Sequence, residues 1–260
     1  MRSTNRGTLF VDSHCHLDRY ENPAAVLAAA RRSGVVVVAV TETPADFRRQ
    51  IGLFDDSYLR PALGLHPLRA ARLSGREVEQ FFSSLGTTDY VGEIGVDLSR
   101  HGKETGRRQM ALFERILEDA RIKNKVLTVH SRGAARETAD RLEQAGVAAI
   151  LHWYTGSLSV AERALAAGNY FSVNPSMLSS KSGRRLLQVL GRDRVLTETD
   201  GPYTKSEGRT SQPSDIPDVT RRLAGLWSVP PDEAAQIVVD NMARLHRATV
   251  GPPLSAPTVR

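Results

Sequence analysis

The sequence predicts a single-domain α/β protein with the fold of a (β/α)8 TIM barrel. Three observations support this prediction: the length of 260 residues, eight short runs rich in β-branched residues, and longer amphipathic segments between them. Barrels of this kind commonly have about 250 residues. Strands that alternate with helices form a parallel sheet, and eight of them suit a closed barrel. An open doubly wound sheet is the second candidate, but it would not bring all eight strand ends around one centre.

The predicted strands and helices follow one another along the chain. Each predicted strand is a short run in which aliphatic or aromatic residues predominate. The eight strands are Leu9–Asp12, Val35–Val40, Arg60–Leu65, Tyr90–Ile94, Val126–His130, Ala149–His152, Tyr170–Val173 and Arg194–Glu198. In the helical segments apolar residues recur every three or four positions, as at Met110, Phe113 and Leu117. These segments include Ala24–Arg32, Gly106–Lys123, Ala134–Gln144, Ser159–Ala167, Gly183–Leu190, Asp215–Leu226 and Asp232–Arg247. Proline interrupts a helix, so Pro230 and Pro231 separate the last two.

One domain accounts for nearly the whole chain. Residues 9–247 are predicted to form the barrel, with a flexible N-terminus over 1–8 and a flexible, proline-rich tail over 248–260. The first residues lack the apolar core of a secretion signal, and no apolar run approaches the roughly 20 residues that span a bilayer. Cys15 is the single cysteine, which excludes an internal disulfide and fits a reducing compartment. We therefore expect a cytoplasmic protein with no membrane partner.

The charge balance is basic, with a formal net charge of +6 and a sequence pI of about 9.8. Such a balance raises the local concentration of a polyanionic substrate. It is equally typical of a solvated, arginine-rich surface. The charge therefore supports a nucleic-acid partner only where the chemistry of the site agrees.

Five of the seven histidines fall at the ends of predicted strands. The other two, His101 and His246, are predicted to lie on the surface. Residues two apart in a strand point to the same face, so His14 and His16 project together while Cys15 points toward the helices. A lone histidine is usually a hydrogen-bonded core residue, but an Asp-x-His-x-His cluster at a strand end favours metal binding.

Six side chains are the predicted metal ligands. They are His14, His16, Glu93, His130, His152 and Asp200. Imidazole and carboxylate ligands suit transition ions, and two ions about 3.5–4 Å apart form a bimetallic hydrolase centre. Glu93 can offer one oxygen to each ion, although a strand-end acid can also form a buried ion pair. Strand eight is adjacent to strand one in a barrel, so Asp200 can share an ion with His14 and His16.

This ligand set predicts hydrolysis by a water that two divalent ions activate. The predicted cofactors are two ions of Mg²⁺, Mn²⁺ or Zn²⁺. Glu93 and Asp200 are the predicted catalytic residues. Asp200 would act as ligand and proton acceptor, orienting the water and later passing its proton to the leaving group.

Six motifs, in this order, resemble those of one family. They are Asp12-Ser13-His14-Cys15-His16-Leu17-Asp18, Gly64-Leu65-His66-Pro67, Gly92-Glu93-Ile94-Gly95-Val96-Asp97, His130-Ser131-Arg132, His152 and Glu198-Thr199-Asp200. With them the chain resembles the TatD-type metal-dependent deoxyribonucleases of the amidohydrolase-like TIM-barrel group, over about residues 9–247. The resemblance implies one metal held by His14, His16, Glu93 and Asp200, and a second held by Glu93, His130 and His152.

The same resemblance implies roles for two residues that are not main ligands. It places His66 near the substrate phosphate, and Arg132 where it can contact a phosphate. An ion pair that holds a loop is an equal alternative for Arg132.

Two departures from the usual family pattern surround the ligands. The usual His-Cys-Phe is here His152-Trp153-Tyr154, and the usual Asp-Ala/Ser-Pro is Asp200-Gly201-Pro202. Neither departure removes a ligand, but both can reshape the pocket. The chain resembles the QatD-like branch associated with Qat anti-phage defence systems, which implies a bacterial host and companion Qat proteins. Three stretches carry this resemblance: Leu151-His152-Trp153-Tyr154-Thr155-Gly156, Pro175-Ser176-Met177-Leu178 and Thr197-Glu198-Thr199-Asp200-Gly201-Pro202-Tyr203.

Aromatic and basic residues near the ligands are candidates for substrate contact. Trp153, Tyr154 and Tyr203 follow ligands and can stack on bases, which is worth roughly 1–3 kcal/mol per base. Alternatively, they pack loops against the barrel rim. Lys181, Arg184 and Arg185 can track a phosphate backbone or lie on a solvated helix face.

Three functions remain open on the sequence alone. The leading one is a metal-dependent DNase, a 3′→5′ exonuclease on single-stranded DNA, in anti-phage defence. The second is a metal-dependent amidohydrolase or deacylase on a small or tRNA-linked substrate, because the same fold hosts both chemistries. The third is a non-catalytic binding subunit of a defence complex, against which the intact ligand set argues.

Overall fold

The computed structural model describes residues 8–251 and confirms the predicted parallel barrel. Its main sheet has eight strands in the order in which they occur along the chain, and every recorded neighbour pair is parallel. The strands are β1 (Phe10–Cys15), β2 (Val35–Ala39), β3 (Leu59–Leu63), β4 (Tyr90–Gly95), β5 (Val126–His130), β6 (Ile150–Leu151), β7 (Tyr170–Val173) and β8 (Val195–Thr197). The helices are α1 (Pro23–Arg32), α2 (Pro44–Leu53), α3 (Gly75–Ser84), α4 (Gly106–Glu118), α5 (Ala135–Ala145), α6 (Leu158–Ala166), α7 (Pro175–Ser179), α8 (Lys181–Val189), α9 (Ile216–Trp227) and α10 (Pro231–Thr249).

The element boundaries differ from the prediction mainly where polar residues end a strand. β5 and β7 have the predicted bounds, whereas β1 extends to Cys15 and β6 shrinks to two residues. A small antiparallel hairpin of β9 (Lys205–Ser206) and β10 (Arg209–Thr210) was not predicted. α10 continues two residues beyond the predicted domain end at 247. Of the two segments predicted to be flexible, 1–8 and 248–260, the structure describes only Thr8 and residues 248–251.

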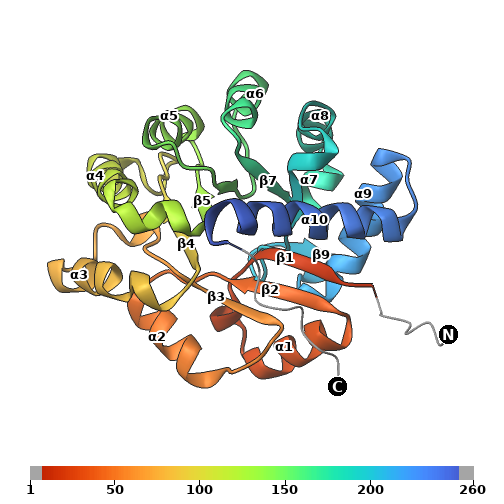
Figure 1. Ribbon diagram of the computed structural model, residues 1–260, viewed down its shortest axis with the longest axis horizontal. Helices are drawn as coiled ribbons and strands as arrows, with labels where there is room; N and C mark the ends of the chain where they lie inside the picture. The colour runs from red at the N-terminus through yellow and green to blue at the C-terminus, as the bar shows by residue number, and fades with distance from the viewer. Residues whose placement is uncertain (1–7, 252–260) are drawn as a thin grey trace.

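The helices form a ring around the barrel (Figure 1). α4, for example, packs an apolar face that contains Phe113, Ile116 and Leu117 against the sheet. The strands are buried on both of their faces, and all six residues of β4 are buried. This double burial explains why the strands appear in the sequence as continuous apolar runs instead of alternating ones. None of the helices among residues 8–251 combines the length and the apolar character needed to cross a membrane.

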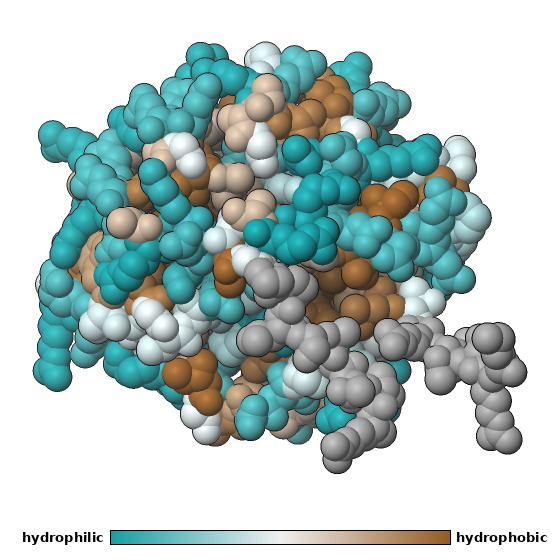
Figure 2. All heavy atoms as spheres, in the orientation of Figure 1, coloured by the Kyte–Doolittle hydropathy of each residue, from teal (hydrophilic) through white to brown (hydrophobic). Residues whose placement is uncertain are grey.

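α10 lies across the centre of the ring, over the beginnings of the strands (Figure 1). Asn241 of this helix donates hydrogen bonds to the carbonyls of Arg192 and Val195, where β8 begins. The prediction that His246 lies on the surface is wrong. Its ring is buried beside Tyr90 at the start of β4, and its Nδ1 is 3.1 Å from the carbonyl oxygen of Gly251. Figure 2 shows this face, where hydrophilic side chains separate small apolar patches.

Polar side chains complete the barrel between β8 and β1. In the described part of the chain no backbone ladder pairs these two strands. Instead the Thr197 hydroxyl donates to the Val11 carbonyl (2.6 Å), and the Ser13 hydroxyl donates to the Thr197 carbonyl (3.0 Å). Just beyond β8, the Asp200 amide donates to the His14 carbonyl (2.9 Å). These bonds bring the end of strand eight to the end of strand one.

Gly92 allows β4 and β5 to approach closely beside the site. A Cβ atom at this position would lie 2.1 Å from Cγ2 of Thr128. The Oγ1 atom of the same threonine is 2.6 Å from Nδ1 of His14. Because Gly92 has no side chain, Thr128 can pack against the backbone next to Glu93 while its hydroxyl contacts His14.

We expect Gly92→Ala to lower the free energy of unfolding of the metal-free protein by about 1–3 kcal/mol, because overpacking displaces Thr128. Urea denaturation measures this loss. Gly52→Ala is the matched control, since no atom lies within 4 Å of a Cβ there and the position is in α2. That control should be neutral or stabilising by up to about 1 kcal/mol. Equal urea midpoints for Gly92→Ala and wild type would contradict the expectation.

Candidate metal centre at the barrel mouth

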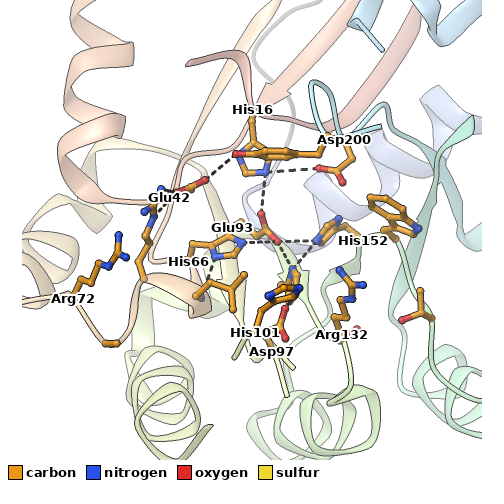
Figure 3. Close-up of a pocket in the computed structure, with 18 residues that line it drawn as sticks. His16, Glu42, His66, Arg72, Glu93, Asp97, His101, Arg132, His152 and Asp200 are labelled. Atoms are coloured by element: carbon orange, nitrogen blue, oxygen red, sulfur yellow. Dashed lines mark hydrogen bonds and ion pairs between the residues drawn. The ribbon is translucent and has the colours of Figure 1, made fainter. Parts of the chain in front are cut away.

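All six predicted ligands meet at the carboxyl ends of the strands. They come from the ends of β1, β4, β5, β6 and β8, and all but His130 are at least nine-tenths buried. They lie at or beneath a cavity of about 760 Å³ that opens at this end of the barrel. Figure 3 shows Glu93 in the middle of the group, with His16 and Asp200 above it, His152 to its right and His66 to its left.

The two oxygens of Glu93 face two separate groups of donors. Oε2 is 3.1 Å from Nε2 of His16 and 3.4 Å from Nε2 of His14. Oε1 is 2.6 Å from Nδ1 of His130 and 2.8 Å from Nε2 of His152. One carboxylate therefore stands between two clusters of imidazole nitrogens.

Asp200 completes the first cluster. Its Oδ1 is 3.6 Å from Nε2 of His14 and 3.8 Å from Nε2 of His16. The aspartate has a φ of +48°, a left-handed conformation that non-glycine residues seldom adopt. The backbone bond from its amide to His14 holds this turn, so closure of the barrel also aims the carboxylate.

The donor set fits divalent metal ions. Nε2 of His14 is buried with no hydrogen-bond partner, although it is aimed at two carboxylates. In the second cluster Nε2 of His152 is 3.3 Å from Nδ1 of His130, and both face the same oxygen of Glu93. Lone pairs crowded in this way repel one another unless protons or cations lie among them. A mixed imidazole and carboxylate set suits transition ions in particular.

The far nitrogens of two ligands meet buried oxygens. Nδ1 of His14 pairs with the Thr128 hydroxyl, and Nε2 of His130 is 2.9 Å from Oδ2 of Asp97. Partners of this kind hold the ring orientation of a metal-binding histidine and set which nitrogen carries the proton. Asp97 was not chosen from the sequence as a site residue, although it closes the motif that contains Glu93.

Comparison with known proteins identifies the family. The model of the TatD related DNase family matches residues 11–247. The chain belongs to the TatD family. A mouse relative described as a putative deoxyribonuclease, TATDN3, is 30% identical over 92% of this chain and 88% of its own. The Escherichia coli K12 protein YcfH, described as an uncharacterized metal-dependent hydrolase, is 30% identical over 90% of this chain and 94% of its own.

A solved structure supports the same assignment. The crystal structure of YJJV, a TatD homologue from Escherichia coli K12, superposes with a TM-score of 0.82 at 28% identity. It covers 91% of this chain and 97% of its own. This TatD-family chain is therefore a metal-dependent hydrolase.

Charge in the TatD-family centre is unevenly distributed. Burial raises the pKa of Asp200 well above its usual value, and the nearby carboxylates of Glu198 and Glu93 add to the effect. Burial opposes ionisation of Glu93 too, but the imidazoles around it, His66 and His152 first, hold its pKa well below the usual range. Burial and neighbouring carboxylates therefore disfavour the charged form of Asp200, whereas the surrounding imidazoles favour the charged form of Glu93.

A hydrogen bond between His130 and Asp97 shifts the pKa values of both groups. Burial alone would lower the pKa of His130, but hydrogen bonds with Asp97 and Glu93 raise it to about 9. The same contact overcomes the burial of Asp97 and lowers its pKa to about 2. A cation bound by His130 must therefore displace a tightly held proton.

His66 lies close to the second cluster. Its Nε2 is 3.4 Å from Oε1 of Glu93, and with Glu93 and His130 it forms a possible ligand group. Nδ1 of His66, however, accepts a hydrogen bond from the backbone N–H of Leu68 (3.1 Å). The ring proton of neutral His66 therefore sits on Nε2, which makes this nitrogen a donor and not a ligand.

The predicted substrate contacts separate into two groups. Arg132, Trp153 and Tyr203 line the cavity, as does His66. Tyr154 does not: its ring is buried against Phe171 and its hydroxyl donates to the Ser157 carbonyl. The β-strand alternation that puts His152 in the mouth ends at this turn, so sequence spacing did not reveal where Tyr154 points.

The basic residues of α8 lie outside the cavity. Arg184 donates to the carbonyls of Leu178 and Ser179, so it holds α7 in place. Lys181 and Arg185 are exposed on the helix. Cys15, as predicted, is a buried packing residue, with its sulfur 3.5 Å from the Gly201 carbonyl oxygen.

Several cavity residues were missed in the sequence. Glu42, Arg69, Arg72 and His101 line the cavity from loops after β2, β3 and β4. His101 is exposed, as predicted, but it belongs to the mouth of the cavity. Glu42 accepts hydrogen bonds from Arg69 and Tyr203, and these contacts join three loops. No strand-end pattern marks such residues, because long loops carry them to the rim.

We expect the melting temperature of metal-free protein to fall between pH 6.5 and pH 9. The pKa of His130, about 9 in the folded state, lies above its ordinary value of 6.5. The stabilisation by its extra proton is complete below pH 6.5 and lost as the pH rises through 9. Added divalent metal should therefore raise the melting temperature most at high pH, because fewer protons compete.

Differential scanning fluorimetry of chelator-treated protein, with and without added Zn²⁺, measures both trends. Asp97→Asn removes a partner that raises the pKa of His130, so the fall should be smaller and should end at a lower pH. Identical melting temperatures of metal-free wild type at pH 6.5 and pH 9 would contradict the assignment.

Proposed function

We propose that this protein is a metal-dependent phosphodiesterase that acts on DNA, with single-stranded DNA as the preferred form. One observation carries the proposal: two clusters of donors share Glu93 at the floor of a cavity whose rim is partly basic and partly aromatic. A mouse relative is described as a putative deoxyribonuclease, which supports the same substrate class.

Two divalent ions are the proposed cofactors. His14, His16, Asp200 and Oε2 of Glu93 would hold one ion, and His130, His152 and Oε1 of Glu93 would hold the other. Bound there, the ions would supply Lewis-acid activation of the attacking water and of the phosphoryl oxygens. Mg²⁺, Mn²⁺ and Zn²⁺ are the candidates.

The residues of the chain would then manage the proton and the phosphate. Asp200 accepts a proton from the water as the new oxygen–phosphorus bond forms. It returns that proton to the leaving alcohol as the phosphorus–oxygen bond to the sugar breaks. His66, with its proton on Nε2, donates to a phosphoryl oxygen from the side of the second cluster.

The rim offers separate surfaces for backbone and bases. Arg72, His101 and Arg132 line the cavity from successive loops after β3, β4 and β5 (Figure 3). Within residues 8–251 no ion pair or side-chain hydrogen bond engages the guanidinium of Arg72 or Arg132. Trp153 and Tyr203 line the other parts of the mouth, where they can stack on bases.

An exonuclease with 3′→5′ polarity is the specific activity that we propose. The cavity of about 760 Å³ suits a terminal segment of a single strand, which can enter the barrel mouth more easily than duplex DNA. Oligonucleotides blocked at either end establish the polarity.

A role in Qat anti-phage defence is the proposed biological setting, with cytoplasmic location and companion Qat proteins. It rests on the sequence of three stretches, Leu151–Gly156, Pro175–Leu178 and Thr197–Tyr203. Loss of phage protection in a host that carries Asp200→Asn, with the companion proteins intact, would support it. Unchanged protection would favour a scaffolding subunit instead.

We expect purified protein to degrade 5′-labelled single-stranded DNA in the presence of Mg²⁺ or Mn²⁺ and not in the presence of chelator. Asp200→Asn should lower kcat about 10²–10⁴-fold, because the proton acceptor is lost. Product ladders on denaturing gels give the rates. Absence of chelator-sensitive cleavage by wild type, or much faster hydrolysis of amides, lactones or aminoacyl esters, would overturn the proposal.

Loss of a rim arginine should weaken DNA binding more than catalysis. We expect Arg72→Ala and Arg132→Ala each to raise KM for an oligonucleotide. The slope of log KM against the logarithm of the salt concentration should also fall by about 0.7 for each phosphate contact that is lost. Arg32→Ala is the matched control, because Arg32 ends α1 at the opposite end of the barrel. A salt slope unchanged in both rim variants would exclude these phosphate contacts.

A further inference from the structure

Glu198 is a buried carboxylate that neither cluster of the centre uses directly. It follows β8, has no exposed surface and does not line the cavity. A buried charge is costly unless several partners satisfy it. The contacts of Glu198 therefore indicate what the residue does.

Three hydrogen-bond donors hold the Glu198 carboxylate. Oε1 accepts from the Trp153 backbone N–H (3.1 Å) and from Nδ2 of Asn174 (3.0 Å), and Oε2 accepts from the Ser172 hydroxyl. These donors follow β6, precede α7 and belong to β7, respectively. Glu198 thus ties the ends of three neighbouring strands together.

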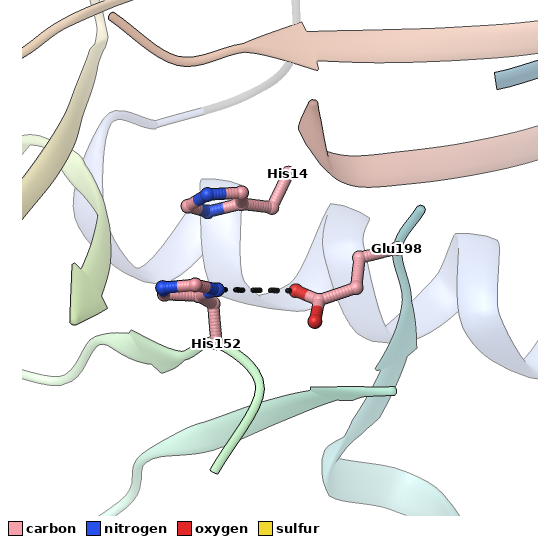
Figure 4. Close-up of side chains that lie close together, drawn as sticks. All are labelled: His14, His152 and Glu198. Carbon is pink, nitrogen blue, oxygen red and sulfur yellow. Dashed lines mark ion pairs between the residues drawn. The ribbon is translucent and has the colours of Figure 1, made fainter. Parts of the chain in front are cut away.

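The carboxylate also faces the far nitrogen of a ligand. Nδ1 of His152 is buried without a hydrogen-bond partner and lies 3.8 Å from Oε2 of Glu198 (Figure 4). The His14 ring stacks on the His152 ring, with centroids 3.8 Å apart and planes within 11°, which restricts rotation of the imidazole. A proton on Nδ1 of His152 would point to the carboxylate and leave a lone pair on Nε2, toward Glu93 and His130.

His14, His152 and Glu198 lie close enough together to form a possible ligand group. Its contacts argue against a further ion there. Both oxygens of Glu198 already accept hydrogen bonds, and Nδ1 of His14 is engaged by Thr128. The arrangement suits orientation of His152 better than coordination of a cation.

Glu198 also holds the turn that follows His152. Trp153 has a φ of +36°, in the left-handed region that a tryptophan rarely occupies. Its backbone N–H is bonded to Glu198, and its indole lines the cavity. One carboxylate thus acts on a ligand and on the adjacent aromatic residue of the cavity wall.

We propose that Glu198 is a positioning residue that keeps the proton of His152 on Nδ1 and holds the Trp153 turn, so that the second cluster can bind its metal ion. This inference rests on the proposed metal centre. It adds that the affinity of one ion depends on a carboxylate that touches neither ion nor substrate.

Titration of metal-free protein with Co²⁺, followed by calorimetry and by the absorption of the bound ion, tests the proposal. In Glu198→Gln we expect the affinity for the second ion to fall about 10–100-fold while the first is unchanged. His152→Ala identifies the binding step of the second ion. Ser172→Ala is the matched control, since it removes a donor to the same carboxylate but leaves the carboxylate facing His152.

The outcomes separate this inference from the proposed function. Wild-type affinity for both ions in a folded Glu198→Gln variant overturns the positioning role and leaves the metal centre intact. Wild type that binds no second ion overturns both. If the variant does not fold, NMR of Zn²⁺-loaded wild type decides: a downfield, slowly exchanging Nδ1–H of His152 supports the role, and a rapidly exchanging one excludes it.

Discussion

Closure of the barrel between β8 and β1 is the contact on which the site depends. Without a backbone ladder at this junction, the strands are joined by hydroxyl and carboxylate groups, chiefly those of Ser13, Thr197 and Asp12. Asp12 accepts from the backbone and hydroxyl of Thr199 and from the His14 backbone N–H. One buried side chain thus sets the spacing between a histidine of strand one and the turn that carries Asp200.

The cost of this arrangement is a concentration of buried charge. Asp12, Glu93, Glu198 and Asp200 are all buried within the mouth of one barrel. Burial raises the pKa of Asp12 to about 7 and opposes ionisation of the others. Imidazoles offset part of this charge at Glu93, and hydrogen bonds offset part at Glu198. Bound divalent ions would offset part of the remaining cost of burying these carboxylates.

The loops above the centre differ in how their charged side chains are paired. Glu42, Arg69 and Tyr203 join the loops after β2, β3 and β8, so this part of the rim is internally paired. Arg72 and Arg132 lie in loops after β3 and β5, without ion-pair partners in the described chain. The rim therefore combines guanidinium groups without ion-pair partners and an internally paired, partly aromatic part, and the loop after β3 contributes to both.

The chain itself determined the architecture and which titratable side chains gather at the barrel mouth. Apolar runs that end in His or acidic residues predicted the eight strands and the six side chains, Glu93 among them, that meet at the barrel mouth, because parallel strands of a barrel finish at one rim. Both features can be recognised within a few residues of the sequence, because each predicted strand is a short apolar run that ends in a titratable residue. The sequence also allowed Glu93 to offer one carboxylate oxygen to each of two clusters, because a carboxylate has two oxygens.

Only the tertiary structure decided which other groups support the centre. Asp97, Thr128 and Glu198 meet the far sides of His130, His14 and His152 through contacts between strands, which spacing along the chain does not encode. Likewise, the turn at Trp153 sends Tyr154 into the core, and α10 buries His246 against the strand beginnings. Periodicity states which face a residue occupies, but packing and backbone turns decide what that residue touches.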